Sequence, residues 1–295
     1  INLGVGYSFA LQNPLVGDRR VIQFALDDAK ELAQLMRSQR KLESKQLLQD
    51  MIIGENIKSL FQPIFNLQDG AVHGYEALCR GPKNTKLEDA SALIAAARQN
   101  NLAFEIDHLS RRKAIEVSRN LDSSFKLFIN TLPFSPQDPR FRGLHLIDLF
   151  RGADLHPQQL VLEVTERQAI TDFSSFVEDM SYFTNMGCLT AVDDIGGGYS
   201  ELERIVHIRP HYLKLDRMLI RDIHESFVKR QSIQLLMDLA QNIDASVIAQ
   251  GIERPEELQA LLELGVTFGQ GFLLAEPAAE FQTESNVDLT SGVKK

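Results

Sequence analysis

The sequence predicts an α/β protein whose strands and helices close into a (β/α)8 barrel, preceded by an N-terminal helical connector. Three observations lead to this fold class. Apolar runs of strand length alternate with helical segments from Leu60 onward. The 295 residues, 44% of them apolar, are sufficient for one large core. Polar side chains follow the successive strands, where the active-site residues of a barrel lie.

Charge and composition argue against several classes of protein. The net charge of -9 disfavours a protein that coats DNA or RNA, since such binding needs clustered Lys and Arg. The chain contains no run of 18 apolar residues and no signal peptide, so we expect a soluble, cytoplasmic piece without membrane contact of its own. Cys79 and Cys188 show no paired spacing and indicate a reducing compartment. Because the chain begins at Ile1, an upstream sensor or membrane domain is a further expectation.

The N-terminal part, residues 1–51, is expected to be a connector or the end of an upstream module. A strand-like patch within residues 1–14 precedes a helix from Val21 to about Met51, whose apolar residues recur every three or four positions. This helix could pack on the main domain or join two domains or two chains, and we favour a connector. We place the barrel domain at residues 52–279 and a flexible polar tail at residues 280–295.

Within the barrel segment, proline and glycine residues mark the bounds of several predicted elements. Pro63 makes the first strand an edge or barrel-lip strand, because proline cannot donate a ladder hydrogen bond. Gly187 ends one helix and Pro255 begins another. The predicted strands are Phe61–Leu67, Val72–Leu78, Phe125–Ile129, Leu160–Val164, Cys188–Val192, Tyr212–Leu215, Ser246–Ala249 and Val266–Phe272. The predicted helices are Glu88–Gln99, Ile106–Asn120, Phe173–Met186, Phe227–Ile243 and one that starts at Pro255.

Polar residues follow most of these strands. Any one of these residues is more readily explained as a helix cap or turn residue than as a ligand. Because the parallel strands of a barrel end at the same rim, the residues together indicate a binding or catalytic site at that rim. The set comprises Glu76, Asn130, Glu163, Asp193, Asp194, Lys214, Asp216, Gln250, Glu253 and Gln270.

The stretch from Asp193 to Ser200 is the most informative. The neighbouring carboxylates of Asp193 and Asp194 repel each other unless a cation lies between them or one is protonated. The three glycines from Gly196 to Gly198 suit a mobile loop beside a ligand. A solvated Asp-Asp turn capped by glycine is the alternative.

The set consists of oxygen ligands, without a histidine at a strand exit. Such sites favour Mg²⁺ or Mn²⁺ over Zn²⁺. Several carboxylates around one mouth can hold two such cations about 3.5 to 4 Å apart, which supports in-line attack of water on a phosphodiester. Lys214 would position that water or stabilise the developing charge.

Several motifs occur in an order that resembles the EAL domain family. They are Gln62-Pro63-Ile64, Tyr75-Glu76-Ala77-Leu78-Cys79-Arg80, Phe128-Ile129-Asn130, Leu162-Glu163-Val164-Thr165-Glu166, Asp193-Asp194, Lys214-Leu215-Asp216, Gly251-Ile252-Glu253 and Gln270-Gly271-Phe272. The resemblance covers about Leu60 to Pro277. It implies a modified TIM barrel with an antiparallel first strand, and hydrolysis of the bacterial second messenger cyclic di-GMP to linear pGpG.

The resemblance also implies residue roles. Glu76, Asn130, Glu163 and Asp193 would bind one Mg²⁺ or Mn²⁺, and Asp193 would bridge to a second that Asp194 also binds. Lys214 would orient the catalytic water, with Gln250 and Glu253 on the neighbouring loop. Substrate contacts would come from Gln62, Leu78, Arg80, Asp216 and Gln270. Glu166 would hold the flexible loop that links metal binding to formation of a homodimer. The alternative for Glu166 is a salt bridge at the barrel rim, and the alternative for Arg80 is an ion pair at the surface.

Two departures from the family pattern qualify the function. Gln250 stands where the family carries a glutamate that assists the water, and loss of a general base costs about 10²- to 10⁴-fold in rate. Ile195 and Gly197 replace the usual Phe and Thr or Ala. The sequence therefore predicts a cyclic di-GMP phosphodiesterase, impaired or carrying an engineered glutamine. A receptor that binds cyclic di-GMP without turnover and relays the signal to a partner is the alternative, and a scaffold blind to the nucleotide is disfavoured.

Overall fold

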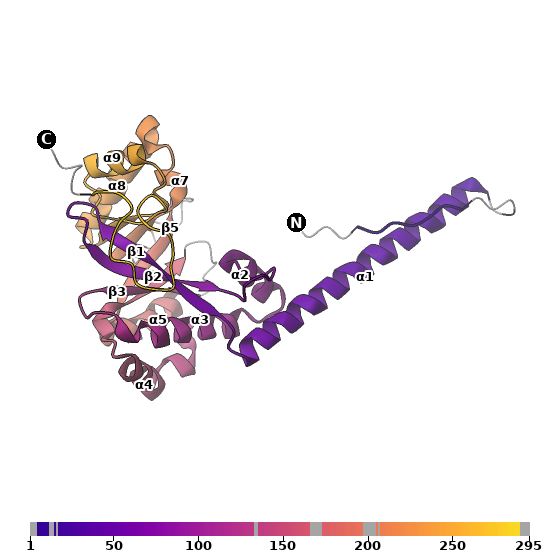
Figure 1. The fold of residues 1–295 in the computed structure, drawn as a ribbon, viewed down its shortest axis with the longest axis horizontal. Coiled ribbons are helices and arrows are strands. Elements are labelled where there is room, and N and C mark those ends of the chain that lie inside the picture. The colour runs from indigo at the N-terminus through magenta and orange to yellow at the C-terminus, as the bar shows by residue number, and fades with distance from the viewer. Residues whose placement is uncertain are drawn as a thin grey trace.

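The protein consists of a barrel domain and a long projecting helix (Figure 1). The structure, a computed structural model, describes residues 5–11, 15, 17–132, 135–165, 173–196, 205 and 207–289. Eight strands close into a barrel in sequence order. The first strand runs antiparallel to both neighbours and the remaining pairs are parallel. The predicted fold class is therefore confirmed, including the antiparallel first strand.

The strands agree closely with the sequence pattern, except at the last. Pro63 lies in β1, whose ladder with β8 contains only two residue pairs, so its missing N–H costs no hydrogen bond to β8. Strand β8 is shorter than predicted, and its ladders with β1 and β7 each contain two residue pairs. The strands are β1 (Lys58–Asn66), β2 (Val72–Arg80), β3 (Lys126–Thr131), β4 (Leu160–Thr165), β5 (Leu189–Ile195), β6 (Tyr212–Leu215), β7 (Ser246–Ala249) and β8 (Phe268–Gly269).

The helices cover the outside of the barrel. Asp89 begins α2 by accepting hydrogen bonds from the backbone N–H groups of Ser91 and Ala92. Helix α4 was not predicted from the sequence. The helices around the barrel are α2 (Ala90–Gln99), α3 (Ala103–Val117), α4 (Gly143–Ala153), α5 (Phe173–Asn185), α7 (Arg217–Ile220), α8 (Phe227–Asn242) and α9 (Pro255–Glu263).

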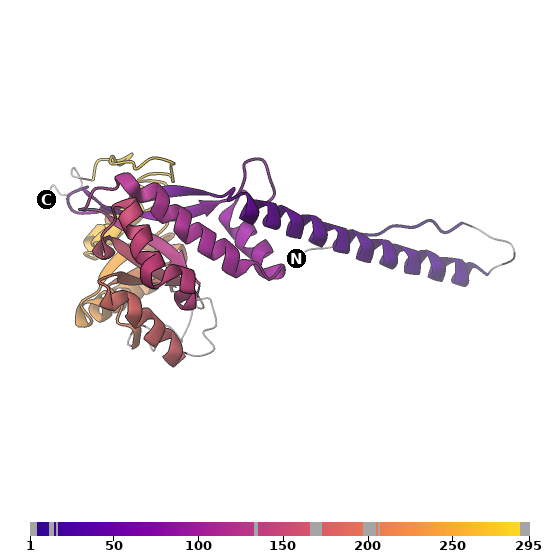
Figure 2. The ribbon, with the colours of Figure 1, turned by 90° about the horizontal axis from the view of Figure 1, so that it is seen from below.

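The predicted N-terminal helix is the 36-residue helix α1 (Asp18–Ile53), which projects away from the barrel in both views (Figures 1 and 2). Its fully buried residues, Leu48 and Met51, lie in its last two turns, where it joins the barrel. Residues 5–11 run back along the helix, so close that a Cβ on Gly6 would lie 1.8 Å from the carbonyl oxygen of Ala29. These residues are not a strand, so the predicted strand-like patch is wrong for residues 5–11.

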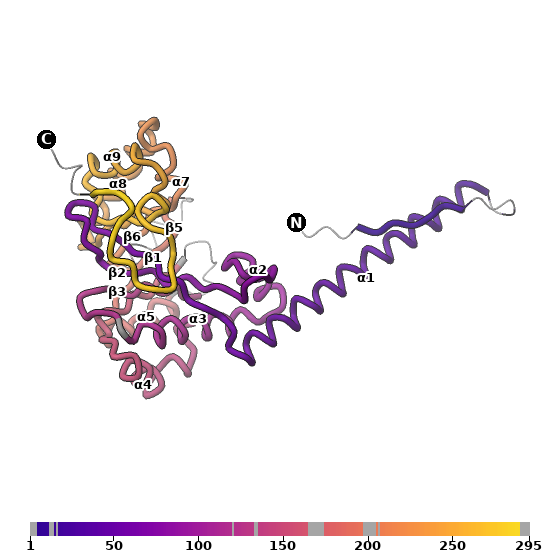
Figure 3. Tube along the Cα trace, viewed as in Figure 1, coloured from indigo at the N-terminus to yellow at the C-terminus, as the bar shows by residue number. Residues whose placement is uncertain are grey.

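The segment after β8 packs on the barrel (Figure 3). The ring of Phe281 lies 4.5 Å from that of Phe61 and 4.8 Å from that of Tyr75. The backbone N–H of Asn286 donates to the carbonyl of Leu274, and Leu289 is buried. The sequence predicts a polar, flexible tail from residue 280, but its apolar side chains Phe281, Val287 and Leu289 pack on the barrel.

An apolar layer of side chains fills part of the barrel interior. On β4, β5 and β6 its residues stand two positions before the charged residues described below. Among the described residues, no helix is long and apolar enough to span a bilayer. The apolar layer consists of Ile64, Phe128, Val161, Ala191, Tyr212 and Ile248.

Candidate active site inside the barrel

Four charged side chains from four strands meet inside the barrel. They are Glu76 on β2, Glu163 on β4, Asp193 on β5 and Lys214 on β6, and none is more than 5% exposed. The Lys214 Nζ atom lies 3.0 Å from Glu76 Oε2 and 3.8 Å from Asp193 Oδ1, and it contacts Glu163 Oε1 directly. The barrel thus places three carboxylates around one ammonium group, and we call this set the acidic centre.

Two amide side chains complete the surroundings of Glu76. Gln270 Nε2 donates a hydrogen bond to Glu76 Oε2 at 2.5 Å, and Asn130 Nδ2 donates to Glu76 Oε1 at 3.2 Å. Gln270 is buried whereas Asn130 is exposed at the end of β3. Asn130 therefore marks the side from which solvent, or a ligand, reaches the acidic centre.

The charges of the acidic centre do not balance, because three carboxylates face one ammonium group. Burial and the neighbouring Glu76 raise the pKa of Glu163 well above its ordinary value. Burial also raises the pKa of Asp193 to about 6. For Glu76, burial acts upward, but Lys214 and Gln270 outweigh it and lower the pKa. For Lys214, the three carboxylates outweigh burial and raise the pKa. Such a site draws in either a proton or a further cation.

The oxygen atoms of the acidic centre are of the chemical kind that binds a divalent cation. Glu163 Oε2, Asp193 Oδ1 and Gln270 Oε1 are buried without a hydrogen-bond donor. Carboxylate and amide oxygens are the ligands that Mg²⁺ and Mn²⁺ prefer. Among the described residues, no three His, Cys, Asp or Glu side chains form a ready metal cage. Instead, the Lys214 ammonium group lies among the carboxylates and supplies positive charge there.

Three further predicted site residues lie at the exits of neighbouring strands: Asp194 near the end of β5, Asp216 after β6 and Gln250 after β7. Asp194 is half-buried with a φ of 58°, the left-handed conformation that leads into Gly196. The Asp216 carboxylate accepts a hydrogen bond from the Met218 backbone N–H at 2.6 Å and so begins α7. Gln250 is half-buried, and its backbone N–H donates to the Leu215 carbonyl at 3.1 Å.

Other predicted residues lie outside the acidic centre. Gln62 stands opposite Glu76 in the β1–β2 ladder and donates to the Ala275 carbonyl at 3.0 Å. Arg80 Nη1 donates to the Cys79 carbonyl, and Leu78 is half-buried between Glu76 and Arg80.

The last two predicted site residues are Glu253 and Glu166. Glu253 is exposed and forms an ion pair with Arg217 at 2.8 Å. Glu166 lies outside the described residues.

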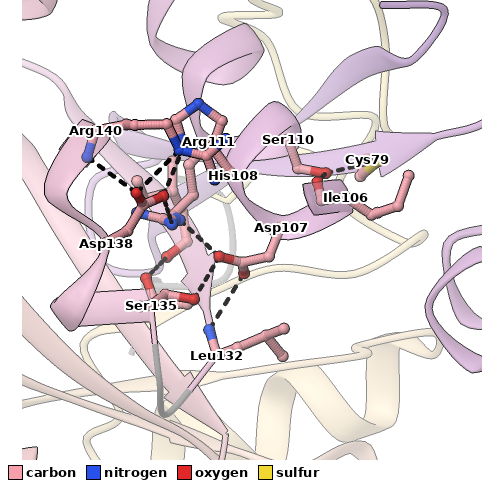
Figure 4. A network of polar contacts seen from close by, with 12 residues as sticks. Cys79, Ile106, Asp107, His108, Ser110, Arg111, Leu132, Ser135, Asp138 and Arg140 are labelled. Atoms are coloured by element: carbon pink, nitrogen blue, oxygen red, sulfur yellow. Dashed lines mark hydrogen bonds and ion pairs between the residues drawn. The ribbon is translucent and has the colours of Figure 1, made fainter. Parts of the chain in front are cut away.

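A second buried polar network, which the sequence interpretation missed, holds the exit of β3 (Figure 4). Asp107 on α3 accepts from the backbone N–H of Leu132 at 3.2 Å and from Arg111 Nε at 2.8 Å. Asp138 Oδ2 accepts from His108 Nδ1 at 2.7 Å and lies 3.4 Å from Arg111. The sequence feature that could have predicted this network is the spacing of Asp107 and Arg111, which lie four residues apart on a helix, next to the apolar Ile106. Leu132 follows Asn130 by two positions, so this network fixes the backbone that carries Asn130.

The comparisons with known proteins agree on one family. A family model described as "EAL domain" matches residues 45–277. The chain is 27% identical over 241 residues to the "Probable cyclic di-GMP phosphodiesterase PdeG" of Escherichia coli K12, which covers 79% of this chain and 47% of the relative. The chain spans less than half the length of the first curated relatives that it matches.

Solved structures show the same similarity. Klebsiella pneumoniae BlrP1, solved as a calcium and cyclic di-GMP complex, is 29% identical with a TM-score of 0.71, over 78% of this chain and 58% of BlrP1. A standalone EAL protein of Vibrio cholerae O395, solved in a cyclic di-GMP-bound form, is 27% identical with a TM-score of 0.70, over 78% of this chain and 95% of that protein.

Proposed function

Because the chain belongs to the EAL domain family, we propose that it is a metal-dependent phosphodiesterase that hydrolyses cyclic di-GMP to linear pGpG. The observation that carries this proposal is the acidic centre, in which three buried carboxylates outnumber one ammonium group. Buried charge in that excess is costly unless a cation joins it. The similar proteins named above, which bind or are named for acting on cyclic di-GMP, supply the class of substrate.

The oxygen ligands divide between two Mg²⁺ or Mn²⁺ ions in this proposal. Glu76, Asn130, Glu163 and Asp193 would hold one ion, and Asp193 and Asp194 the other. Two such ions supply charge that stabilises the phosphate and lowers the pKa of water.

The remaining residues would act on the water and the nucleotide. Lys214, already inside the acidic centre, would donate hydrogen bonds to the attacking water and to the developing negative charge. Gln62, Leu78 and Arg80 would bind the nucleotide along β1 and β2, and Asp216 and Gln270 would complete the inner site.

Gln250 limits how fast this chain turns over its substrate. An amide can contact a cation or donate a hydrogen bond, but it cannot take a proton from water at neutral pH. If the residue at this position acts as the general base, its replacement lowers the rate by about 10²- to 10⁴-fold. We therefore propose slow turnover with binding retained. The same observation favours the second candidate function, a receptor that binds cyclic di-GMP and passes the signal to a partner.

The test is to incubate the protein with cyclic di-GMP and Mn²⁺ and to measure pGpG by chromatography. Gln250→Glu should raise the rate at least about a hundredfold over wild type. Gln241→Glu is the matched control, since this exposed residue of α8 changes charge equally but lies outside the site, and it should behave as wild type. If Gln250→Glu binds the nucleotide and forms no pGpG, the enzyme proposal fails and the receptor takes its place.

The cellular location and the oligomeric state of the protein are also proposals. A cytoplasmic location fits the two free cysteines. A homodimer, with Glu166 linking the loop after β5 to the subunit contact, is supported by the family resemblance alone. Sedimentation at increasing protein concentration tests it, and a monomer at all concentrations would reject it.

A further inference from the structure

Helix α7, a single turn that follows β6, adjoins the exits of both β5 and β7. The backbone N–H of Asp216, immediately before the helix, donates to the Ile195 carbonyl at the end of β5 at 2.9 Å. The Gln250 N–H, immediately after β7, donates to the Leu215 carbonyl at 3.1 Å. The strand exits that carry Asp194 and Gln250 therefore share α7 as a neighbour.

Both ends of α7 are held in place. The Asp216 carboxylate caps its start through the hydrogen bond to the Met218 N–H. Lys229 on α8 caps its end, because the Nζ atom donates to the carbonyls of Met218 at 2.6 Å and Arg221 at 2.5 Å. Ile220 in the same turn is fully buried in the core. A turn held in this way can support the loops on either side of it.

Arg217, the first residue of α7, lies across the loop that follows β7. A Cβ on Gly251 would lie 2.7 Å from Arg217 Cγ, so the aliphatic part of the arginine touches the backbone next to Gln250. Gly251 has a φ of 69°, a conformation that glycine adopts without strain. The guanidinium group of Arg217 then forms its ion pair with Glu253 at 2.8 Å. One side chain thus contacts this loop at two points.

The exit of β8 supports the same loop. The Ile252 N–H donates to the Gln270 carbonyl at 3.1 Å, and the Leu273 N–H donates to the Ile252 carbonyl at 3.1 Å. A Cβ on Gly271 would lie 2.2 Å from the Ile252 backbone nitrogen and oxygen. Ile252 is fully buried. The loop after β7 is therefore held from β8 through its backbone and from α7 through Arg217.

The same turn also packs on the exit of β5. A Cβ on Gly196 would lie 2.6 Å from Leu219 Cγ, so the leucine side chain touches the backbone two positions after Asp194. Gly196 has a φ of 140°, a conformation that other residues rarely adopt. Helix α7 thus contacts a glycine next to each of two predicted site residues.

We propose that α7 positions two groups of the site: Arg217 holds the loop that carries residue 250, and Leu219 holds the loop that carries Asp194. The inference rests on the proposed function, in which residue 250 adjoins the attacking water and Asp194 binds the second metal ion. Arg217 and Leu219 are positioning residues, because they act through these loops without touching the substrate. A displacement of about 1 Å at a reacting group can cost about 10²-fold in rate, so a smaller shift of the loop should still be measurable.

The first test uses Gln250→Glu as the parent enzyme, so that residue 250 can act as a base. Adding Arg217→Ala should lower kcat for pGpG formation about tenfold and leave KM within about twofold, because residue 250 acts on water and not on nucleotide binding. Arg217→Met keeps the aliphatic contact with Gly251 and loses only an exposed ion pair, so kcat should stay within about threefold of the parent.

Arg230→Ala is the matched control for the loss of an ion pair. Arg230 on α8 pairs with Glu263 on α9 at 3.0 Å, outside the site, and its removal should leave kcat of the parent unchanged. Hydrogen exchange, followed by mass spectrometry of the peptide that contains residues 250–253, adds a measurement that needs no turnover. Arg217→Ala should speed exchange of the Gln250 and Ile252 N–H groups at least about tenfold, whereas Arg217→Met and Arg230→Ala should not.

The second test addresses the contact with β5. Leu219→Ala removes the side chain that packs on Gly196, and the Mn²⁺ concentration for half-saturation should rise at least about threefold in calorimetric titration, because Asp194 loses its support. Met218→Ala, an exposed change in the same turn, is the control and should match wild type. Equal Mn²⁺ binding in Leu219→Ala and wild type would contradict the role of α7 at this loop.

The outcomes of the first test separate this inference from the proposed function. If Gln250→Glu forms pGpG and Arg217→Ala changes neither kcat nor hydrogen exchange, only the inference about α7 fails. It also fails if Arg230→Ala lowers kcat as much as Arg217→Ala, or if exchange becomes faster while kcat stays unchanged. If Gln250→Glu binds the nucleotide and forms no pGpG, the proposed enzyme function fails, and the role of α7 in turnover fails with it.

Discussion

Lys214 on β6 donates a hydrogen bond to Glu76 on β2 at 3.0 Å, across 138 positions of the chain. Only closure of the barrel brings these two residues together. Both are buried, and the same ammonium group contacts Glu163. One lysine therefore partly neutralises an acidic centre that would otherwise contain only uncompensated carboxylates.

Removal of this ammonium group should destabilise the protein. For Lys214→Met without metal at neutral pH, we expect the free energy of unfolding to fall by about 3–5 kcal/mol, because buried carboxylates lose their partner. Turnover should be lost as well. Urea unfolding followed by circular dichroism measures the change. The double variant Lys214→Met/Glu163→Gln should recover part of the loss, since one carboxylate is gone; no recovery, or no loss in the single variant, would contradict the charge account.

The network around Asp107 should support the site from behind. Asp107→Asn removes the negative charge that faces Arg111 and weakens the hold on the Leu132 backbone. We expect a loss of about 3 kcal/mol in the free energy of unfolding, because a buried charge pair is broken. We also expect a higher Mn²⁺ concentration for half-saturation, because the backbone held at Leu132 is the one that positions Asn130. Metal titration and urea unfolding measure the two effects.

A matched control separates this role from general loss of an ion pair. Asp179 forms an ion pair with Arg142 at 2.9 Å near the surface, and Asp179→Asn should cost less than about 1 kcal/mol and leave Mn²⁺ saturation unchanged. If Asp107→Asn destabilises the protein but does not change Mn²⁺ saturation, the network is structural only.

His73 should make stability depend on pH. It stacks on Phe268 at 4.1 Å between ring centroids, its Nε2 lies 2.9 Å from the Tyr212 hydroxyl, and burial lowers its pKa to about 4. The unfolded chain, with an ordinary histidine, binds a proton below about pH 6.5 whereas the folded protein does not. Stability is therefore full above pH 6.5 and falls as the pH drops toward 4.

The expected size of this effect is about 2 kcal/mol between pH 7.5 and pH 5. Other groups titrate in the same range, so the measured quantity is the difference between wild type and His73→Gln in urea unfolding at each pH. That difference should favour wild type less at pH 5 than at pH 7.5. A difference that does not change with pH would show that His73 titrates normally in the folded protein.

The sequence pattern was most informative where one strand is buried on both faces. Strands β6 and β7 have the predicted bounds, because short apolar runs between turn residues leave little choice of register. Helix α4 was missed because Gly143 and Gly152 lower its helix propensity. Its buried residues Leu146, Phe150 and Ala153 nevertheless recur every three or four positions in the sequence, as expected for a helix.

The polar residues at the strand exits follow the same logic. The alternation of side chains places Glu76, Glu163 and Lys214 inside the barrel once the strands are known. It does not reveal that Asp216 begins α7 or that Glu253 pairs with Arg217, since both contacts depend on loops. Nor does it reveal the ammonium group between the carboxylates, which depends on side-chain conformation across the barrel.

The most direct test of the account is calorimetric titration of cyclic di-GMP into the wild-type protein and Asp193→Asn, with Mn²⁺ and with a chelator. Asp238→Asn, an exposed change on α8, is the control. The account predicts that wild type and the control bind the nucleotide far more tightly with Mn²⁺, and that Asp193→Asn loses this dependence. Equal binding with and without metal in the wild type, or unchanged metal-dependent binding in Asp193→Asn, would contradict it.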